Sequence, residues 1–401
     1  MADWQHTALP TDLRPGSEAA ALGIYIHWPF CIAKCPYCDF NSTAAAAIDF
    51  ARWQSALERD LLAYVPLTPG RTVTSVFFGG GTPSLMPPET VATILAAVRA
   101  QWTVGDDVEI TLEANPSTVD RSRFRDLRAA GVNRLSIGVQ SFADEDLRFL
   151  GRTHSAAEAK AAIETAHAVF PRVSFDLIYG LPGQTAAAWT QALTDALSCA
   201  GDHLSTYQLT IAPGTPFARR GVRAADEDLG LALFATTDEV LARAGFAAYE
   251  ISNHARGSAV CRHNVAIWQG GNYLAVGPGA HGRLTLQAAA DAAGTLALHQ
   301  VEEPSAWLKQ VEETGSGLNA QDLLSAIERR DELVLMGLRL AAGLERQRFR
   351  HLTGRHPEDV LNRAALDRLT AEGYLVCDAA GVRVTSKGRP CLDHLSATLL
   401  C

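Results

Sequence analysis

Apolar and polar positions alternate in blocks along the chain, and the blocks predict strands and helices in regular succession. Six short runs rich in Val, Ile, Leu, Phe and Tyr are bounded by Gly, Pro or Asn, as strands are; they cover residues 23–28, 75–78, 108–113, 134–140, 172–178 and 203–210. Stretches with helical spacing of apolar positions alternate with them, and the clearest cover residues 47–65, 88–101, 117–130, 155–169, 185–200 and 225–244. Six alternations of strand and helix predict an α/β fold, a partial (βα)6 TIM-like barrel with right-handed crossovers.

The pattern changes in the last quarter of the chain. Residues 328–344 have the spacing of an amphipathic helix, and residues 357–372 predict a second helix. Two short apolar runs on either side of Ala380-Gly381 predict a hairpin. Helices followed by a hairpin are typical of a winged helix, so we expect a C-terminal helical, winged-helix-like domain over residues 301–401.

The remaining boundaries follow from the same pattern. Residues 1–22 contain Asp3, Asp12 and Glu18 and lack the apolar core of a signal peptide, so they predict a flexible N-terminal tail. The barrel core is expected over residues 23–250, and residues 251–300 are expected to link it to the C-terminal domain.

Composition narrows the class of protein. The chain has 401 residues, of which 47% are hydrophobic and 20% charged, so it can form a sizeable core and is not a disordered chain. Its net charge of −9 provides no basic surface for nucleic acid or anionic lipid. No apolar run approaches the roughly 20 residues that span a bilayer. Eight cysteines are too sparse for a secreted disulfide framework, so we expect a cytoplasmic protein.

Cys31, Cys35 and Cys38 follow the first predicted strand and are the most informative chemical feature. A [4Fe–4S] cube normally binds four cysteines, so three would leave one iron open to a substrate. The alternative is a zinc site completed by His27 or Asp39. Zinc sites usually use a second Cys-x-x-Cys pair, and this sequence has none. The spacing therefore favours an iron–sulfur cluster.

Polar residues recur where the predicted strands end. The glycine-rich run from Gly79 to Thr82 follows the second strand, Glu113 and Gln140 end the third and fourth, and Asp176 lies late in the fifth. In β/α barrels these strand ends share one rim, which carries the active site. The alternatives are ordinary turn chemistry and, for Glu113, an ion pair with Arg134 inside the barrel. A buried carboxylate needs a partner, so the rim predicts a bound polar or cationic ligand.

A second group of chemically capable residues lies beyond the six strands: Cys261, His263, Trp268, Tyr273 and His281. Histidine is a common axial ligand of heme iron, and the two aromatic rings can lie on a porphyrin. From the residues alone, a core histidine bonded to the backbone, with Trp268 as packing, is the commoner arrangement.

The motifs together resemble a known family. The run Tyr25-x-His27-x-Pro29-Phe30-Cys31-x3-Cys35-x-Tyr37-Cys38, the Gly79–Pro83 turn and Glu113-x-Asn115-Pro116 are similar to radical S-adenosylmethionine enzymes. The chain resembles more narrowly the oxygen-independent coproporphyrinogen III oxidase group and, within it, the heme chaperones. The resemblance covers nearly the whole chain from about Gly23 and implies the barrel of the radical S-adenosylmethionine type.

The resemblance implies roles for individual residues. Cys31, Cys35 and Cys38 would hold a [4Fe–4S] cluster whose open iron binds S-adenosylmethionine. Tyr25, Gly80 and Glu113 match positions around that cosubstrate. Further residues match positions that hold a second S-adenosylmethionine in the dehydrogenases, and they are Tyr37, Gly81, Thr82, Gln140, Arg152 and Asp176.

Within the family, three sequence features distinguish the chaperones from the dehydrogenases. The dehydrogenases have a further cysteine where this chain has Phe40, and a longer N-terminal arm. His263-Asn264-x-x-x-Trp268 is similar to the chaperones' HNxxYW heme motif, with Ile267 in place of the tyrosine. His263 becomes the candidate heme ligand and Trp268 a candidate heme contact.

Three functional hypotheses follow. The first is a heme chaperone with cluster, S-adenosylmethionine and heme, which passes heme to an unidentified acceptor such as a membrane-bound respiratory protein. The second is an oxygen-independent coproporphyrinogen III dehydrogenase, with Arg134 and Arg152 as candidate partners for substrate carboxylates. The third is a zinc-binding regulator with a winged-helix tail. Whether the protein is an enzyme, and whether it forms a homodimer, is left open at this stage.

Overall fold

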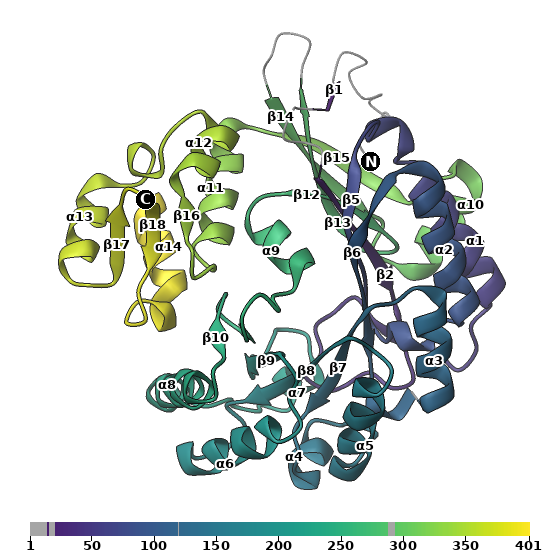
Figure 1. Ribbon diagram of the computed structural model, residues 1–401, viewed down its shortest axis with the longest axis horizontal. Coiled ribbons are helices and arrows are strands. Elements are labelled where there is room, and N and C mark those ends of the chain that lie inside the picture. Colours follow the sequence, from purple (N-terminus) through teal and green to yellow (C-terminus); the bar gives the residue numbers. More distant parts are fainter. Residues whose placement is uncertain (1–13, 16–20, 119, 288–292) are drawn as a thin grey trace.

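Parallel strands form the centre of the computed structural model, which describes residues 14–15, 21–118, 120–287 and 293–401 (Figure 1). Six parallel strands are neighbours in sequence order: β2 (Ala21–Trp28), β5 (Thr72–Gly80), β6 (Thr103–Ala114), β7 (Arg134–Gln140), β8 (Arg172–Tyr179) and β9 (His203–Gln208). They overlap all six predicted runs, although β9 ends two residues before the predicted end at residue 210, and the α/β fold class is confirmed. Most of the predicted tail, residues 1–22, lies outside the described residues.

Helices cover the outer face of this sheet (Figure 1). The main ones are α1 (Phe50–Leu62), α2 (Pro88–Gln101), α3 (Arg121–Ala130), α5 (Ala156–His167), α6 (Ala186–Leu197) and α8 (Glu227–Arg243). Short polar side chains before five of them accept hydrogen bonds from the first helical turn, and they are Asp49, Asp120, Ser155, Thr185 and Asp226. These N-caps account for where the helices begin, including α3, which begins four residues after the predicted start.

The sheet continues beyond the six parallel strands at both edges. β11 (Asn253–Ala255) and β10 (Ala247–Ala248) extend it past β9. At the other edge β12 (Asn272–Val276) is parallel to β2, and β13 (His281–Gln287), β14 (Ala293–Gln300) and β15 (Leu318–Leu324) follow antiparallel. Residues 251–300, which we expected to link two domains, thus contribute strands to the sheet. The domain limits themselves stay a prediction.

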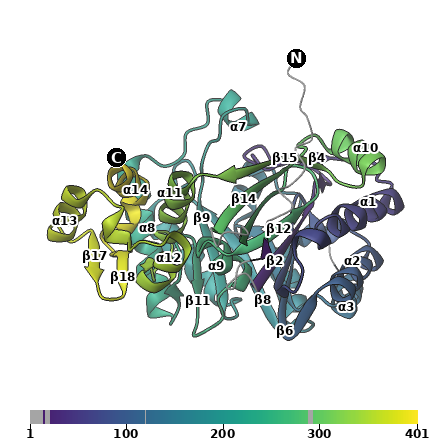
Figure 2. The same ribbon diagram turned by 90° about the horizontal axis from the view of Figure 1, so that it is seen from above.

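The C-terminal part has a core of its own, built from Leu333, Leu344, Phe349, Leu366, Leu395 and their neighbours. Its elements are α11 (Ala326–Gly337), β16 (Leu344–Glu345), α12 (Arg346–Thr353), α13 (Arg363–Ala371), β17 (Leu375–Asp378), β18 (Gly381–Val384) and α14 (Leu392–Leu400). The predicted hairpin is confirmed as β17–β18. Figure 2 shows these elements at one end of the molecule, beside α8 and opposite α1.

The helix predicted over residues 328–344 is too long. It ends at Gly337, and Leu344 instead pairs with Val382 in a three-stranded sheet. Gly343, with φ +69°, turns the chain between them. The apolar spacing persisted to Leu344 because Leu340 and Leu344 are buried here without being helical.

None of the helices in the described ranges combines the length and the apolar character that a bilayer crossing needs.

A pair of stacked tryptophans connects the antiparallel strands β13–β15 to the barrel. Trp307 of α10 (Pro304–Thr314) is fully buried, and its ring lies 5.4 Å from that of Trp53 on α1, at an interplanar angle of 12°. Its indole N–H donates to Gln300 Oε1 at the end of β14, at 2.9 Å. One side chain therefore joins α1, α10 and the antiparallel strands.

We predict that Trp307→Ala lowers the free energy of unfolding by about 3–5 kcal/mol, because it leaves a cavity and removes the hydrogen-bond donor of Gln300 Oε1. Urea denaturation followed by far-ultraviolet circular dichroism measures this change. The control Leu231→Ala, at a side chain that is 40% exposed, is expected to stay within about 0.5 kcal/mol of wild type. An equal effect of the two substitutions would contradict the role given to Trp307.

Candidate functional site

The loop that follows β2 folds back on itself and holds three cysteines. β3 (Phe30–Cys31) pairs with β4 (Thr43–Ala44), which closes the loop, and Cys38 N donates to Cys35 O inside it at 3.1 Å. All three thiols are half-buried. Burial raises the pKa of Cys31, the Thr82 hydroxyl lowers it, and Cys38 and Cys35 raise it further. The three cysteines therefore lie on one loop that the β3–β4 pairing closes.

A cation stands beside this loop. Arg152 Nη1 lies 3.4 Å from Cys35 Sγ, and Nη2 donates to Gly138 O at 2.7 Å. Thiolate is the form of cysteine that binds metal, and a guanidinium at this distance can offset the negative charge of a metal-bound thiolate. Burial raises the pKa of the neighbouring Tyr37, against the charge of Arg152. This edge of the loop can therefore hold negative charge.

The glycine turn after β5 packs against the base of the cysteine loop. Gly81 N donates to Trp28 O at 2.7 Å, and Thr82 N donates to Phe30 O at 2.9 Å. Gly80 has φ +113°, and a Cβ there would lie 2.6 Å from the His27 ring; at Gly81 a Cβ would lie 2.7 Å from Phe30 O. Only glycine permits this close approach.

The His27 side chain bonds to the backbone of the cysteine loop. Its Nε2 donates to Asn41 O at 2.8 Å, so its Nδ1 is left to accept from the Tyr25 hydroxyl at 3.0 Å. Burial lowers the pKa of His27, in keeping with a neutral ring. Both nitrogen atoms are thus engaged, and the ring braces the loop. The sequence reading considered His27 only as a zinc ligand and missed this role, although its place in the motif pointed to it.

Gln140 ends β7 in a strained conformation. Its φ of +72° is the only positive value at a non-glycine residue in the described part of the chain. Its Oε1 atom is buried without a hydrogen-bond partner. Backbone strain and an unpartnered polar atom are typical of positions that contact a ligand.

A cavity of about 240 Å³ lies inside the barrel next to these loops. Its polar and aromatic lining includes Tyr25, Phe77, Glu113, Arg134, Asp176 and His263. Burial and the charge of Asp176 raise the pKa of Glu113 to about 8. Burial also raises the pKa of Asp176 to about 6, against hydrogen bonds from Ser205 and Ser136 and the charge of Arg134. Two carboxyl groups with raised pKa values form a site suited to a cationic ligand.

Arg134 does not take the role that the sequence suggested for it. No ion pair joins it to Glu113 among the described residues. Glu109 instead pairs with Arg172 at 2.6 Å. Although burial raises it, the pKa of Glu109 is lowered by Arg134 and Arg172. Arg134 acts on Glu113 only through its charge, which lowers the pKa, and Glu113 Oε2 accepts from Gly80 N at 3.2 Å.

His263 lies on α9 (Arg262–Trp268), which borders the cavity. The side chain is 3% exposed, its ring stacks on Phe77 with centroids 5.1 Å apart, and Nδ1 lies 3.0 Å from Ser75 Oγ. Nε2 is buried without a partner. Burial lowers the pKa of His263 to about 4, so the ring is neutral. Glu109 Oε1 accepts from His263 N at 3.1 Å and fixes the start of the helix.

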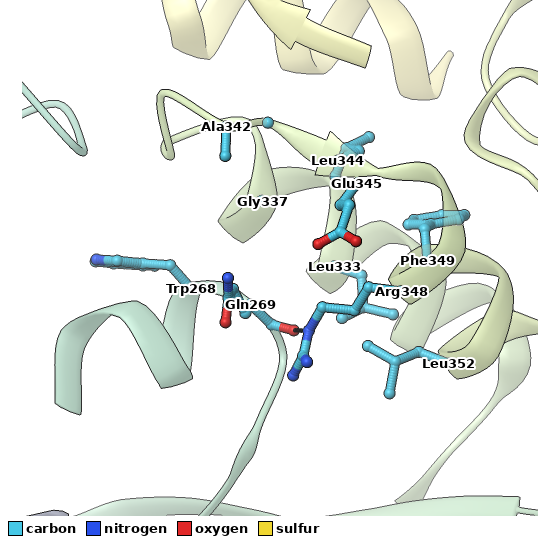
Figure 3. Close-up of a pocket in the computed structure, with 11 residues that line it drawn as sticks. Trp268, Gln269, Leu333, Gly337, Ala342, Leu344, Glu345, Arg348, Phe349 and Leu352 are labelled. Atoms are coloured by element: carbon cyan, nitrogen blue, oxygen red, sulfur yellow. Dashed lines mark hydrogen bonds between the residues drawn. The ribbon is translucent and has the colours of Figure 1, made fainter. Parts of the chain in front are cut away.

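Trp268 faces a different space. Its ring lies under the guanidinium of Arg339, 4.6 Å from the carbon to the ring centroid. Together with Leu333, Leu344 and Phe349 it lines a small pocket of about 40 Å³ against the C-terminal elements (Figure 3). Ile267, which stands where the motif has tyrosine, lines the barrel cavity instead. The structure thus places His263 and Trp268 on separate cavities.

Six of the other singled-out residues line one of two cavities, whereas the rest line neither, and these are Cys31, Tyr37, Cys38, Gly80, Gly81 and Gln140. Cys35, Thr82 and Arg152 line one hollow at the barrel mouth, and Tyr25, Glu113 and Asp176 line the cavity below it. Gly80 connects the two through its bond to Glu113. Sequence reasoning missed Tyr207 and Asn253, which also line the cavity, because neither belongs to a recognisable motif.

Comparisons with known proteins agree with this geometry. Residues 25–196 match the radical SAM superfamily, and residues 324–391 match the HemN C-terminal domain. The chain is 40% identical to the mitochondrial radical S-adenosyl methionine domain-containing protein 1 of Bos taurus, over 98% of this chain and 90% of that protein. It is 38% identical to heme chaperone HemW of Escherichia coli (strain K12), over 93% of this chain and 97% of that protein.

A solved structure gives the same fold. Coproporphyrinogen III oxidase (HemN) from Escherichia coli superimposes with a TM-score of 0.79 at 23% identity, over 96% of this chain and 90% of that one. The chain therefore belongs to the radical S-adenosylmethionine superfamily, in its coproporphyrinogen III oxidase-like family. HemW heme chaperones of 36–38% identity are among its relatives in that family.

Membership of the superfamily implies a [4Fe–4S] cluster and S-adenosylmethionine, and the residues fit both. A cube binds each thiolate through a different iron, so its ligands need not converge on one point. No three His, Cys, Asp or Glu side chains within the described ranges are arranged around a single metal ion. A cationic cosubstrate would find polar partners here. They are the backbone of the glycine turn, which no Cβ atom covers, the unpartnered Gln140 oxygen and the carboxyl groups of Glu113 and Asp176.

We predict that stability falls as pH rises through the range in which Glu113 ionises. Glu113 binds its proton more tightly in the folded protein, where its pKa is about 8, than at its ordinary value of 4.5. The contribution of Glu113 to the free energy of unfolding is therefore complete below pH 4.5 and is lost as pH rises through 8. Urea denaturation from pH 5 to 7, without S-adenosylmethionine, measures the decline.

Glu113→Gln keeps an acceptor for Gly80 N and removes the proton. We expect this variant to reduce the decline by up to about 1.4 kcal/mol per pH unit. A slope identical to that of wild type would show that Glu113 is ionised in the folded protein throughout this range.

Proposed function

We propose that this protein is a heme chaperone that binds a [4Fe–4S] cluster, S-adenosylmethionine and heme, and passes heme to an acceptor protein. The observation that carries the proposal is identity of 36–38% to HemW heme chaperones over 93% of the chain. Phe40, where the dehydrogenases have a further cysteine, supports the same choice. The acceptor, the oligomeric state and the cytoplasmic location remain parts of the proposal; relatives of 39–40% identity are named as mitochondrial.

Cys31, Cys35 and Cys38 would hold the cluster, and the residues at the mouth and in the cavity would hold S-adenosylmethionine. A cluster held by these three cysteines would supply the electron for reductive chemistry at the sulfonium group of the cosubstrate. The chain's own contribution is to orient and enclose it: Gly80 and Gly81 permit close approach of the backbone, and Arg152 balances thiolate charge at Cys35. Glu113 would release a proton on binding a cation, because its pKa is raised to about 8, whereas Asp176, with a pKa of about 6, is already mostly ionised at neutral pH.

We predict that Cys35→Ala abolishes cluster assembly, while Cys199→Ala, at a half-buried thiol on the outer helical layer, leaves it intact. Iron, sulfide and zinc assayed after anaerobic reconstitution measure this outcome. Zinc bound by wild type without iron and sulfide would support the zinc-binding regulator in its place.

The heme part of the proposal concerns His263. Its neutral ring has the free Nε2 that an iron ligand requires, and a proton on Nδ1 can be held by Ser75. Because the side chain is buried, α9 would have to turn away from the barrel before heme could reach it. Trp268 faces the C-terminal elements, so it would meet heme only after the same movement.

We predict that His263→Ala weakens heme binding by about tenfold or more while iron and sulfide contents stay unchanged. A heme titration of the anaerobically reconstituted protein, followed by the Soret band, measures it. His394→Ala, at an exposed histidine on α14, is the matched control. Heme affinity equal in all three proteins would remove His263 as the ligand.

The second candidate function is oxidative decarboxylation of coproporphyrinogen III. The HemN-like fold favours it. Its candidate carboxylate partners are already engaged, since Arg134 acts on Glu109 and Arg152 contacts Cys35 and Gly138. Product analysis with reduced cluster and S-adenosylmethionine distinguishes the functions: formation of protoporphyrinogen would show that chaperone activity is not the sole function.

A further inference from the structure

Two histidines outside the sites described above face each other across neighbouring strands. His281 begins β13 and is the register partner of His299 near the end of β14. The centroids of their imidazole rings lie 4.2 Å apart, as expected for cross-strand partners on one face of an antiparallel pair. Neither ring has a hydrogen-bond partner among the residues that the structure describes. Their nitrogen atoms are therefore available to a ligand.

The pair lies at the rim that carries the cysteine loop. β12 is parallel to β2 and antiparallel to β13, so β13 starts at the edge where β2 ends. Asn41 of the cysteine loop donates to Pro278 O at 3.0 Å and to Glu302 O at 2.8 Å. Pro278 precedes His281 by three residues and Glu302 follows His299 by three. The two imidazoles thus stand beside the loop, at the barrel mouth.

Solvent can reach both imidazole rings. His281 is exposed and His299 is half-buried. Burial, His299 and Arg283 lower the pKa of His281, against the charge of Glu302, which raises it. Neutral imidazole is the form that binds a metal. Glu302 is exposed, and its charge raises the pKa of His281. No three His, Cys, Asp or Glu side chains in the described ranges surround a single metal ion, so the two imidazoles alone would be the protein's ligands.

We propose that His281 and His299 form a binding site for a first-row transition-metal centre at the barrel mouth. Imidazole nitrogen suits nickel, zinc, copper and iron, and water or a third ligand would fill the remaining coordination positions. Nothing in the function proposed above uses this pair. Its exposure contrasts with the burial of His263, so a metal centre can reach it without movement of α9.

The centre can come from two sources, a free divalent ion or the iron of heme. Binding of heme iron at this pair rests on the proposed heme function, whereas binding of a free divalent ion does not. A heme iron would take one imidazole as axial ligand and leave the other beside it, since two rings on one side of a porphyrin cannot both bind along its axis.

The test uses full-length protein with its cluster reconstituted anaerobically, as wild type, His281→Ala, His299→Ala and the control His394→Ala. Each protein is titrated with Ni²⁺ by calorimetry and, separately, with hemin by the Soret band. We expect Ni²⁺ affinity to fall by about tenfold or more in both rim variants and to stay unchanged in the control. His281→Gln and His299→Gln repeat the measurement with polar side chains that keep more bulk, in case alanine disturbs the strand pairing.

The hemin titrations identify the source. Hemin affinity that falls together with Ni²⁺ affinity assigns heme iron to the pair, and Ni²⁺ affinity that falls alone assigns a free ion. Ni²⁺ binding that depends on the pair, in a wild-type protein that binds no hemin, upholds the site and contradicts the proposed heme function. Ni²⁺ and hemin affinities that are equal in all variants would overturn the site.

Discussion

Parallel pairing of β2 with β5 is the constraint on which the site depends. It places the ends of the two strands side by side, so that the cysteine loop and the glycine turn leave the sheet at one point. The backbone of the turn then bonds to Trp28 and Phe30 at distances of 2.7 and 2.9 Å, in a space that a Cβ at Gly80 or Gly81 would occupy. The cluster loop is thus shaped by the sheet beneath it as much as by its own residues.

Buried charge sets the chemistry of the cavity below. Glu109 of β6 pairs with Arg172 and accepts from the backbone at the start of α9. Among the described residues, Glu113 and Asp176 form no ion pair, and their pKa values are raised. Transfer of a carboxylate from water without a cation is unfavourable, so Glu113, whose pKa is raised to about 8, carries a proton at neutral pH in the free protein. The same barrel wall therefore contains the Glu109–Arg172 ion pair, which is structural, and the carboxyl groups of Glu113 and Asp176, which are suited to binding a cation.

The short helix α9 stands between the barrel and the C-terminal elements. His263 and Ile267 face the barrel cavity, while Trp268 packs under Arg339 from the other side. Arg348 Nε donates to Gln269 O at 2.8 Å, and Arg329 donates to Gly270 O at 2.6 Å, which ties the end of α9 to the C-terminal domain. Any movement that exposes His263 must therefore involve these arginine contacts as well.

The sequence by itself determined the six parallel strands, most of the helices that cover them and the family, because apolar periodicity, N-cap residues and the cysteine spacing are local signals. Only the tertiary structure decided that residues 251–300 extend the sheet, that His263 and Trp268 face different cavities, and that His281 meets His299. These outcomes depend on which strands pair and on which side of a seven-residue helix each side chain is buried. Long-range packing sets both, and no short stretch of sequence records it.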